Sequence, residues 1–197
     1  MEPHSDMYPI VQKRIADEIE KIITHQVTPW VSLQTTAGLN VKKFDGKEIR
    51  YGGIGFSGSA QEVFWGRYIE PFLEHAASAT IEYVIGMCSE THSKLEPALV
   101  DTYKLLTAGV RAVYEEMVDV DRRLRGAGEP DKVRPQNIEH LVHGMEQFIE
   151  NRISAEIKMR SRSPVTAWLQ RWYKRNQVLV WIIGILATLL SAISPWL

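Results

Sequence analysis

Residues 52–58 form the segment whose composition comes closest to a phosphate-binding turn. The segment holds four glycines, and residues 53–58 match the pattern G-x-G-x-x-G between a candidate strand and a candidate helix. Backbone N–H groups at the start of a helix bind phosphate in such turns. The wider context differs, because no later strand completes a βαβ unit and no G-x-x-x-x-G-K-[ST] pattern is present. We therefore interpret the segment as a turned connector. The alternative is an anion site formed by Gly53, Gly55, Ser57, Gly58 and Ser59.

A second candidate for chemistry is a row of carboxylates and imidazoles late in the chain. Glu139, His143, Glu146 and Glu150 follow spacings of four, three and four, which places them on one helical face. Di-iron bundles use Glu-x-x-His, whereas the order here is His143-x-x-Glu146. Further ligands would come from a second helix, with the candidates Glu70, Glu74 and His75. Polar residues at these spacings more often form a solvated face. We therefore expect no metal, and His143 and Glu146 stay as weak candidates.

The single cysteine, Cys88, excludes an intramolecular disulfide and a zinc cluster built from cysteines. His92 lies within reach of it on a helix, but nucleophilic catalysis also needs an activated thiolate, an orienting group and an oxyanion site. No G-x-S-x-G pattern is present. The residue pattern disfavours an enzyme, and we expect no cofactor. A metal- or phosphate-ligand-binding enzyme is kept as a third hypothesis.

The charges of the chain divide it into two unlike parts. The 197 residues carry 23 Lys and Arg against 24 Asp and Glu, yet the last acidic residue is Glu156 and six basic residues follow it. Residues 1–157 hold 17 basic and all 24 acidic residues, so their formal charge is −7. An acidic body disfavours nucleic-acid binding. Six cations beside an apolar segment suit the anionic headgroups of a bilayer.

The C-terminal segment has the length and composition of a membrane span. Residues 176–197 contain no charged side chain, and about 20 apolar residues suffice to cross a bilayer. The basic residues precede the span, so the positive-inside rule places the N-terminus in the cytoplasm. We expect a tail-anchored, single-pass protein of a bacterial inner membrane or an organelle surface, with no N-terminal signal peptide. The residues expected at the membrane interface are Arg162, Trp168, Arg171, Trp172, Tyr173, Lys174, Arg175 and Trp196.

Four small residues share one face of this predicted transmembrane helix. Their spacings of three, four and three would let two membrane helices approach closely. Small residues are common in membrane helices, so self-association and a plain anchor both stay open. The four residues are Gly184, Ala187, Ser191 and Ser194.

Apolar spacing predicts helices through most of the remaining chain. The cleanest pattern repeats every seven positions from Leu99 to Leu124, and its stripe is wide enough for a bundle rather than a dimeric coiled coil. Pro71 should kink or divide the helix in which it lies. The expected helices cover residues 7–26, residues 60–87, the stretch after Pro97 and residues 135–159.

Residues 30–52 have the pattern of a small β element. Residues 39–44 and 47–51 flank Asp45-Gly46, a pair that two-residue type I′ turns favour. Residues 30–36 alternate between apolar and polar side chains, which makes a three-stranded meander the larger alternative. An isolated hairpin is marginal in water, so we expect it to lean on the helices.

These patterns predict a mainly α protein with three parts. They are a cytoplasmic helical bundle over 1–160 with a hairpin at about 30–52, a basic juxtamembrane segment over 161–176 and a transmembrane anchor over 177–197. No motif is specific enough to indicate a family. The first functional hypothesis is a protein-interaction or assembly module that associates with the anionic bilayer and with a protein partner or further copies of itself. The second is a membrane effector that oligomerises through its transmembrane helix and perturbs or gates the bilayer.

Overall fold

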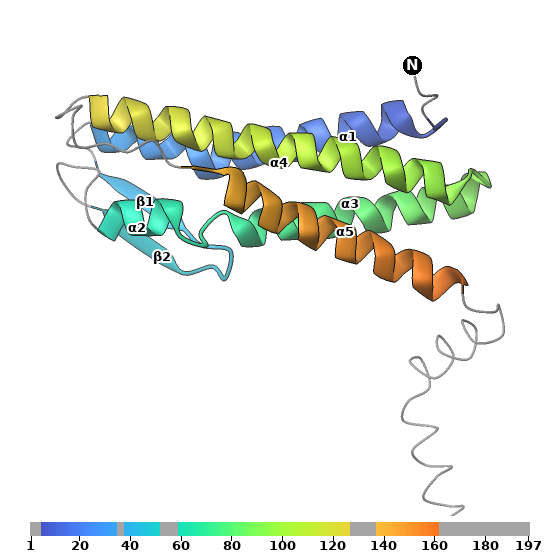
Figure 1. Cartoon of the computed structure of the whole chain (residues 1–197). Coiled ribbons are helices and arrows are strands. Elements are labelled where there is room, and N and C mark those ends of the chain that lie inside the picture. The colour runs from blue at the N-terminus through green and yellow to red at the C-terminus, as the bar shows by residue number, and fades with distance from the viewer. Residues whose placement is uncertain (1–4, 35–37, 52–58, 127–136, 162–197) are drawn as a thin grey trace, which may run out of the picture. The chain divides into compact units, whose positions relative to one another are not determined.

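The computed structural model is mainly helical, with one antiparallel sheet of two strands, as the patterns predict (Figure 1). Met1–Ile153 form one compact unit and Ser154–Leu197 a second. All but the first residue of the predicted juxtamembrane and transmembrane segments (161–197) lies outside the described residues. The structure describes residues 5–34, 38–51, 59–126 and 137–161.

Helix α1, Tyr8–Ile22, lies within the predicted helix 7–26 and turns an apolar stripe inward, with Val11, Ile15 and Ile22 buried and Ile10 43% exposed. The stripe continues past the helix, but Pro29 cannot prolong an α-helix because it lacks an N–H and its ring clashes with the preceding turn. The chain widens into a π-helix over Ile23–Val27 and then tightens into a 3-10 helix over Thr28–Gln34. The first helical run therefore passes Pro29 by changing its pitch.

The 3-10 helix shows that the predicted third strand at 30–36 is wrong. Val27, Trp30 and Leu33 are all buried, and their spacing of three matches the three residues per turn of a 3-10 helix. The backbone φ that proline imposes suits this tight helix. Burial of every third residue, and not of every second, therefore decides the conformation.

The predicted hairpin is present as strands β1, Leu39–Lys42, and β2, Glu48–Tyr51. The strands pair antiparallel, with Leu39 opposite Tyr51 and Lys42 opposite Glu48. Leu39 and Val41 are buried on the inner face of β1. The hairpin leans on helical residues, because the Tyr51 ring lies 5.7 Å from the ring of Trp30.

The turn of the hairpin differs from the predicted two-residue type. The Lys43 N–H donates to the Lys47 carbonyl at 2.8 Å, and the Gly46 N–H donates to the Lys43 carbonyl at 3.0 Å. In Asp45-Gly46 only the glycine has a positive φ, 84°. A type I′ turn requires a positive φ at both of its central residues. The turn therefore has three residues, with Gly46 in the left-handed conformation that glycine adopts at least cost.

Pro71 divides the next helical stretch in two, as the sequence predicts. Helix α2 covers Ser59–Trp65 and helix α3 covers Glu70–Thr91. Pro71 lies in the first turn of α3, where its missing N–H would have had no helical partner. Helix α3 ends at His92, whose φ of 57° turns the chain into the next helix.

Helix α4, Leu95–Gly126, carries the predicted seven-residue seam. Tyr103 is half-buried, and the other seam residues are buried. Figure 1 shows α3 and α4 lying antiparallel after the short connection at His92. The fully buried members of the seam are Leu99, Leu106, Val110, Val113, Met117, Val120 and Leu124.

Helices α1 and α4 run parallel and approach each other closely. The Ser5 N–H donates to the Asp101 carboxylate at 2.7 Å, near the start of both helices. Further along, a Cβ placed on Gly109 of α4 would lie 2.8 Å from Cγ1 of Ile19 and 3.5 Å from Ile15. A side chain at Gly109 would therefore force the Ile19 side chain, or the helix that carries it, to shift.

We predict that Gly109→Leu lowers the free energy of unfolding by roughly 1–3 kcal/mol, the usual cost of overpacking a close contact. The matched control is Gly86→Leu in α3, because a Cβ at Gly86 meets no atom within 4 Å. That control should raise stability, since leucine favours a helix over glycine by up to about 1 kcal/mol. Thermal unfolding of the full chain in detergent, followed by circular dichroism, measures both. Equal effects at the two glycines would contradict the close approach.

Candidate functional site

Helix α5, Glu139–Ser161, carries the predicted row of carboxylates and imidazoles. A side-chain cap holds its first turn, because Asn137 Oδ1 accepts the Glu139 N–H at 3.0 Å. Val142, Met145 and Ile149 are buried and attach the helix to the bundle.

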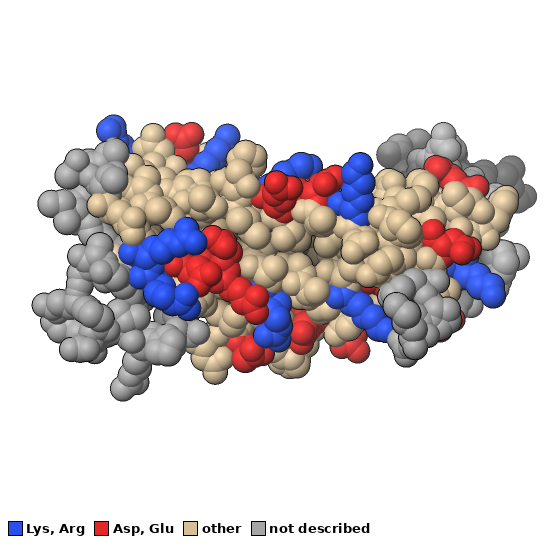
Figure 2. Space-filling view, turned by 90° about the horizontal axis from the view of Figure 1, so that it is seen from above, with Lys and Arg blue, Asp and Glu red and all other residues tan. Residues whose placement is uncertain are grey.

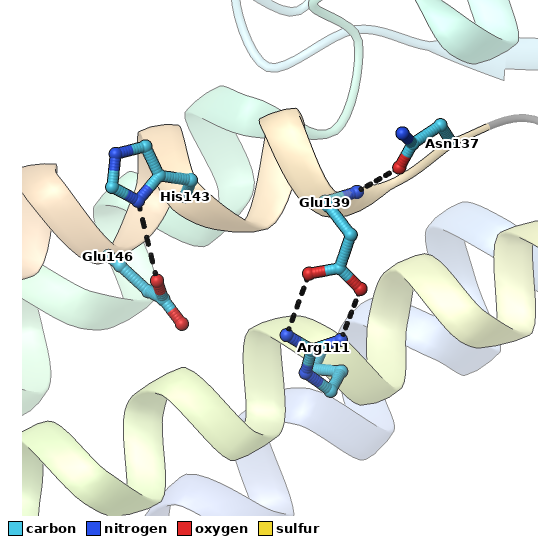
Figure 3. Close-up of polar contacts among 5 residues, drawn as sticks. All are labelled: Arg111, Asn137, Glu139, His143 and Glu146. Carbon is cyan, nitrogen blue, oxygen red and sulfur yellow. Dashed lines mark hydrogen bonds and ion pairs between the residues drawn. The ribbon is translucent and has the colours of Figure 1, made fainter.

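An exposed ion pair ties the start of α5 to the middle of α4. Arg111 donates two hydrogen bonds to the Glu139 carboxylate, at 2.8 and 3.1 Å (Figure 3). Hydrogen bonding from Arg111, followed by its charge, lowers the pKa of Glu139 below its usual range. The same carboxylate raises the pKa of Arg111. The two parallel hydrogen bonds fix the relative orientation of the two side chains. An exposed ion pair without such geometry usually adds little to stability.

His143 and Glu146 lie together one turn further along α5. His143 Nδ1 is 3.7 Å from a Glu146 carboxylate oxygen (Figure 3). The other ring nitrogen, Nε2, is 2.9 Å from Nε2 of Gln147. Both ring nitrogens therefore face side chains of the same helix. Figure 3 shows Glu139 directed instead toward Arg111.

Two residues of the second helix that were candidate metal ligands contact side chains other than those of α5. On the second helix Glu70 pairs with Arg67 at 3.5 Å, and the His75 ring lies 5.5 Å from the ring of Phe44. Within the ranges that the structure describes, no group of three or more His, Cys, Asp or Glu side chains could hold a metal ion. The geometry therefore gives the metal interpretation no support.

A second ion pair attaches α5 to α3. Arg152 donates a hydrogen bond to Glu82 at 2.8 Å, two turns of helix beyond the buried Met145. The Arg111 pair thus links α5 to α4 before its buried stretch, and the Arg152 pair links α5 to α3 after it. Beyond Ile153 the side chains of Ile157 and Met159 are 41% and 44% exposed.

Several predicted site residues lie outside the described part of the chain. Ser59 begins α2, and the other four residues of the possible anion site belong to the undescribed segment 52–58. The interface residues and the small-residue face lie in 162–197, also outside. Among the helices that the structure describes, none combines the length and the apolar character that a membrane crossing requires.

Cys88 is a core residue of α3, with 5% of its surface exposed. His92 follows it at the left-handed residue that ends the helix. A reactive cysteine needs an electropositive, partly exposed environment that stabilises the thiolate. The burial of Cys88 within the apolar core is instead typical of a structural residue.

Sequence reasoning missed the residues that attach α5 and one exposed aromatic ring. Arg111 and Arg152 have partners 28 and 70 positions away, which no local pattern indicates. Phe44 is 49% exposed at the tip of the hairpin, and its ring centroid lies 5.2 Å from that of Phe72. It helps to line two shallow surface grooves. An aromatic residue next to Asp45-Gly46 was a signal that could have marked it.

We predict that Arg111→Gln loosens the start of α5 without unfolding the bundle. Hydrogen–deuterium exchange of residues 139–150 should become faster, while exchange in α3 stays unchanged. The control is Arg122→Gln, because the Arg122 pair with Asp119 stays within α4. The pKa of Glu139 is lowered in the folded chain. The stabilisation from its ion pair with Arg111 is therefore present at neutral pH and is lost as the pH falls through that lowered pKa. In acid, residues 139–150 of Arg111→Gln and of the unmodified chain should therefore show the same protection from exchange.

Comparisons with known proteins identify no relative of this chain. No protein-family model, curated protein or solved structure matches the chain. A functional proposal must therefore be supported by the residues of this chain.

Proposed function

We propose that this chain is a membrane-anchored assembly module. Its C-terminal segment crosses the bilayer once, and its helical bundle lies in the cytoplasm, where it binds a protein partner or further copies of itself. The single observation that carries the proposal is the sequence 162–197, in which a basic segment precedes 22 residues without charge. Apolar length and one-sided positive charge are the two features that determine insertion and orientation.

Helix α5 supports the proposal as the connection between bundle and anchor. It is held to the bundle by three buried side chains and by an ion pair at each end of the buried stretch. The same helix runs on to Ser161, directly before the basic segment.

The surface of the bundle also supports a role in protein contacts. Acidic and basic side chains are interspersed on the face shown in Figure 2, and several form local pairs such as Lys21 with Glu18 at 3.0 Å. Nucleic-acid binding instead requires a continuous basic surface. In the described residues Cys88 is buried within the apolar core, and His143 contacts Glu146 and Gln147 of its own helix.

We predict that the full chain stays with membranes during alkaline extraction. Replacing Ile182, Leu186 and Leu190 together by arginine should release it, because each arginine near the bilayer centre opposes insertion by about 2.5–3.5 kcal/mol. The matched control exchanges Ile182 for leucine and the two leucines for isoleucine, which keeps the segment apolar. Release of the unmodified chain would refute the anchor, and so would retention of the arginine variant.

The bilayer-perturbing alternative has support only from the row of small residues at Gly184, Ala187, Ser191 and Ser194. For an assembly module we expect liposomes that contain the full chain to retain an enclosed dye at high protein density. Leakage that Gly184→Leu abolishes would favour the effector instead, because leucine at this position blocks close helix approach. Dye release should be compared with that of protein-free liposomes of the same lipid.

A further inference from the structure

The hairpin leaves one edge of its sheet without a partner strand. The sheet has two strands, and β1 packs beside the 3-10 helix Thr28–Gln34. In the described part of the chain no strand pairs with the outer side of β2. Figure 1 shows β2 at the rim of the hairpin, on the side away from α1 and α4. Open strand edges are templates for pairing with another chain.

The register of the hairpin determines which backbone groups face outward from β2. The Lys43 N–H donates to the Lys47 carbonyl, and antiparallel pairs alternate between bonded and non-bonded. Counting from this pair, Val41 and Ile49 form a bonded pair, while Lys42 with Glu48 does not. The N–H and C=O groups of Glu48, and by the same alternation those of Arg50, therefore point away from β1. They are available to a third strand.

The side chains at these two positions carry opposite charges. Glu48 and Arg50 are both exposed and lie on the same face of β2, two residues apart. Among the described residues neither has an ion-pair partner. Ile49 lies between them and is half-buried on the opposite face. The edge thus presents an acid, an apolar residue and a base in sequence.

We infer that β2 pairs antiparallel with β2 of a second copy of this chain, centred on Ile49. In this register the outward backbone groups of Glu48 meet those of Arg50 in the second copy, and the reverse pair forms by symmetry. Each acid then lies opposite a base, and the two Ile49 side chains meet in the non-bonded pair at the centre. The two hairpins become one sheet of four strands.

Charge selects this register over its neighbours. A shift that centres the pairing on Glu48 places the two acids opposite each other, and centring on Arg50 opposes the two bases. Parallel pairing would also bring like charges side by side. Like charges directly opposite are unfavourable in sheets, whereas opposite charges stabilise them. The edge is therefore complementary to itself in one arrangement.

The pairing rests on the proposed function in one respect. Strands of four residues form a weak interface in dilute solution. Anchoring in one membrane raises the effective concentration of the copies, so that a weak edge contact is populated. Both hairpins then contribute to a self-assembling surface on the cytoplasmic side.

Cross-linking of the full chain in liposomes of phosphatidylcholine and phosphatidylglycerol tests the register. Ile49→Cys should form a disulfide between copies under mild oxidation, since opposed non-bonded residues have Cα atoms about 4.5 Å apart. The matched control is Asn40→Cys, an exposed residue of β1 that three strand spacings separate from its counterpart. The unmodified chain controls for Cys88, which is buried.

Charge exchange tests the specificity, with each variant introduced into the Ile49→Cys chain. Glu48→Arg and Arg50→Glu should each reduce the initial cross-linking rate about tenfold, because each places like charges opposite each other twice. In an equal mixture of the two variants half of the encounters join unlike chains and restore both opposite-charge pairs, so the rate should recover to about half of the original. The double variant with both exchanges should cross-link at the original rate. Circular dichroism checks that each variant keeps its helical content.

Flotation of the liposomes separates this inference from the proposed function. Insertion without cross-linking at Ile49→Cys overturns the β2 pairing and leaves the anchored module intact. If both single charge variants cross-link as fast as the Ile49→Cys chain with its original charges, the pairing is overturned too, since contact would then not depend on the edge. Cross-linking that follows the charge pattern in a chain that does not insert supports the pairing and refutes the anchor.

Discussion

The parallel packing of α1 against α4 is the constraint on which the rest of the bundle depends. Gly109 lets the two helices approach until Ile15 and Ile19 lie against its backbone. Two parallel helices cannot be joined by a short turn, so the chain has to travel back along the bundle between them. Helix α3 makes this return and lies against both, with the Arg14 guanidinium 4.4 Å above the Tyr83 ring. The hairpin and α2 fill the end where the direction reverses.

Trp30 organises that end of the molecule. Its ring lies 4.9 Å from Phe64 and 5.7 Å from both Tyr51 and Tyr68, mostly in edge-on arrangements that aromatic rings favour. Burial raises the pKa of Tyr68 to about 12, so its hydroxyl stays protonated and donates to Gln26 at 2.8 Å. A hairpin of four-residue strands would be marginal alone. The aromatic contacts hold it against the helices and so determine where its open edge lies.

Two features of the fold have fewer internal partners than the core, and both bear on the proposed function. Helix α5 is attached by three buried side chains and two exposed ion pairs, whereas every seam residue of α4 except the half-buried Tyr103 is buried. Strand β2 offers its outer backbone groups to a further strand. Elements with few buried contacts open more readily than the core does. The proposed assembly and membrane attachment would thus use the parts of the molecule that the core leaves least constrained.

The sequence by itself determined the local features of this protein. Seven-residue spacing predicts the buried seam of α4, and Pro71 predicts a helix break, because both act within a few turns. The adjacency of His143 and Glu146 follows from their spacing for the same reason. Only the tertiary structure decided that the stretch around Trp30 is a 3-10 helix, since burial against distant rings overrides its alternating pattern. It alone decided the partner of Arg111 as well, because a contact across 28 residues depends on how helices pack and leaves no local pattern.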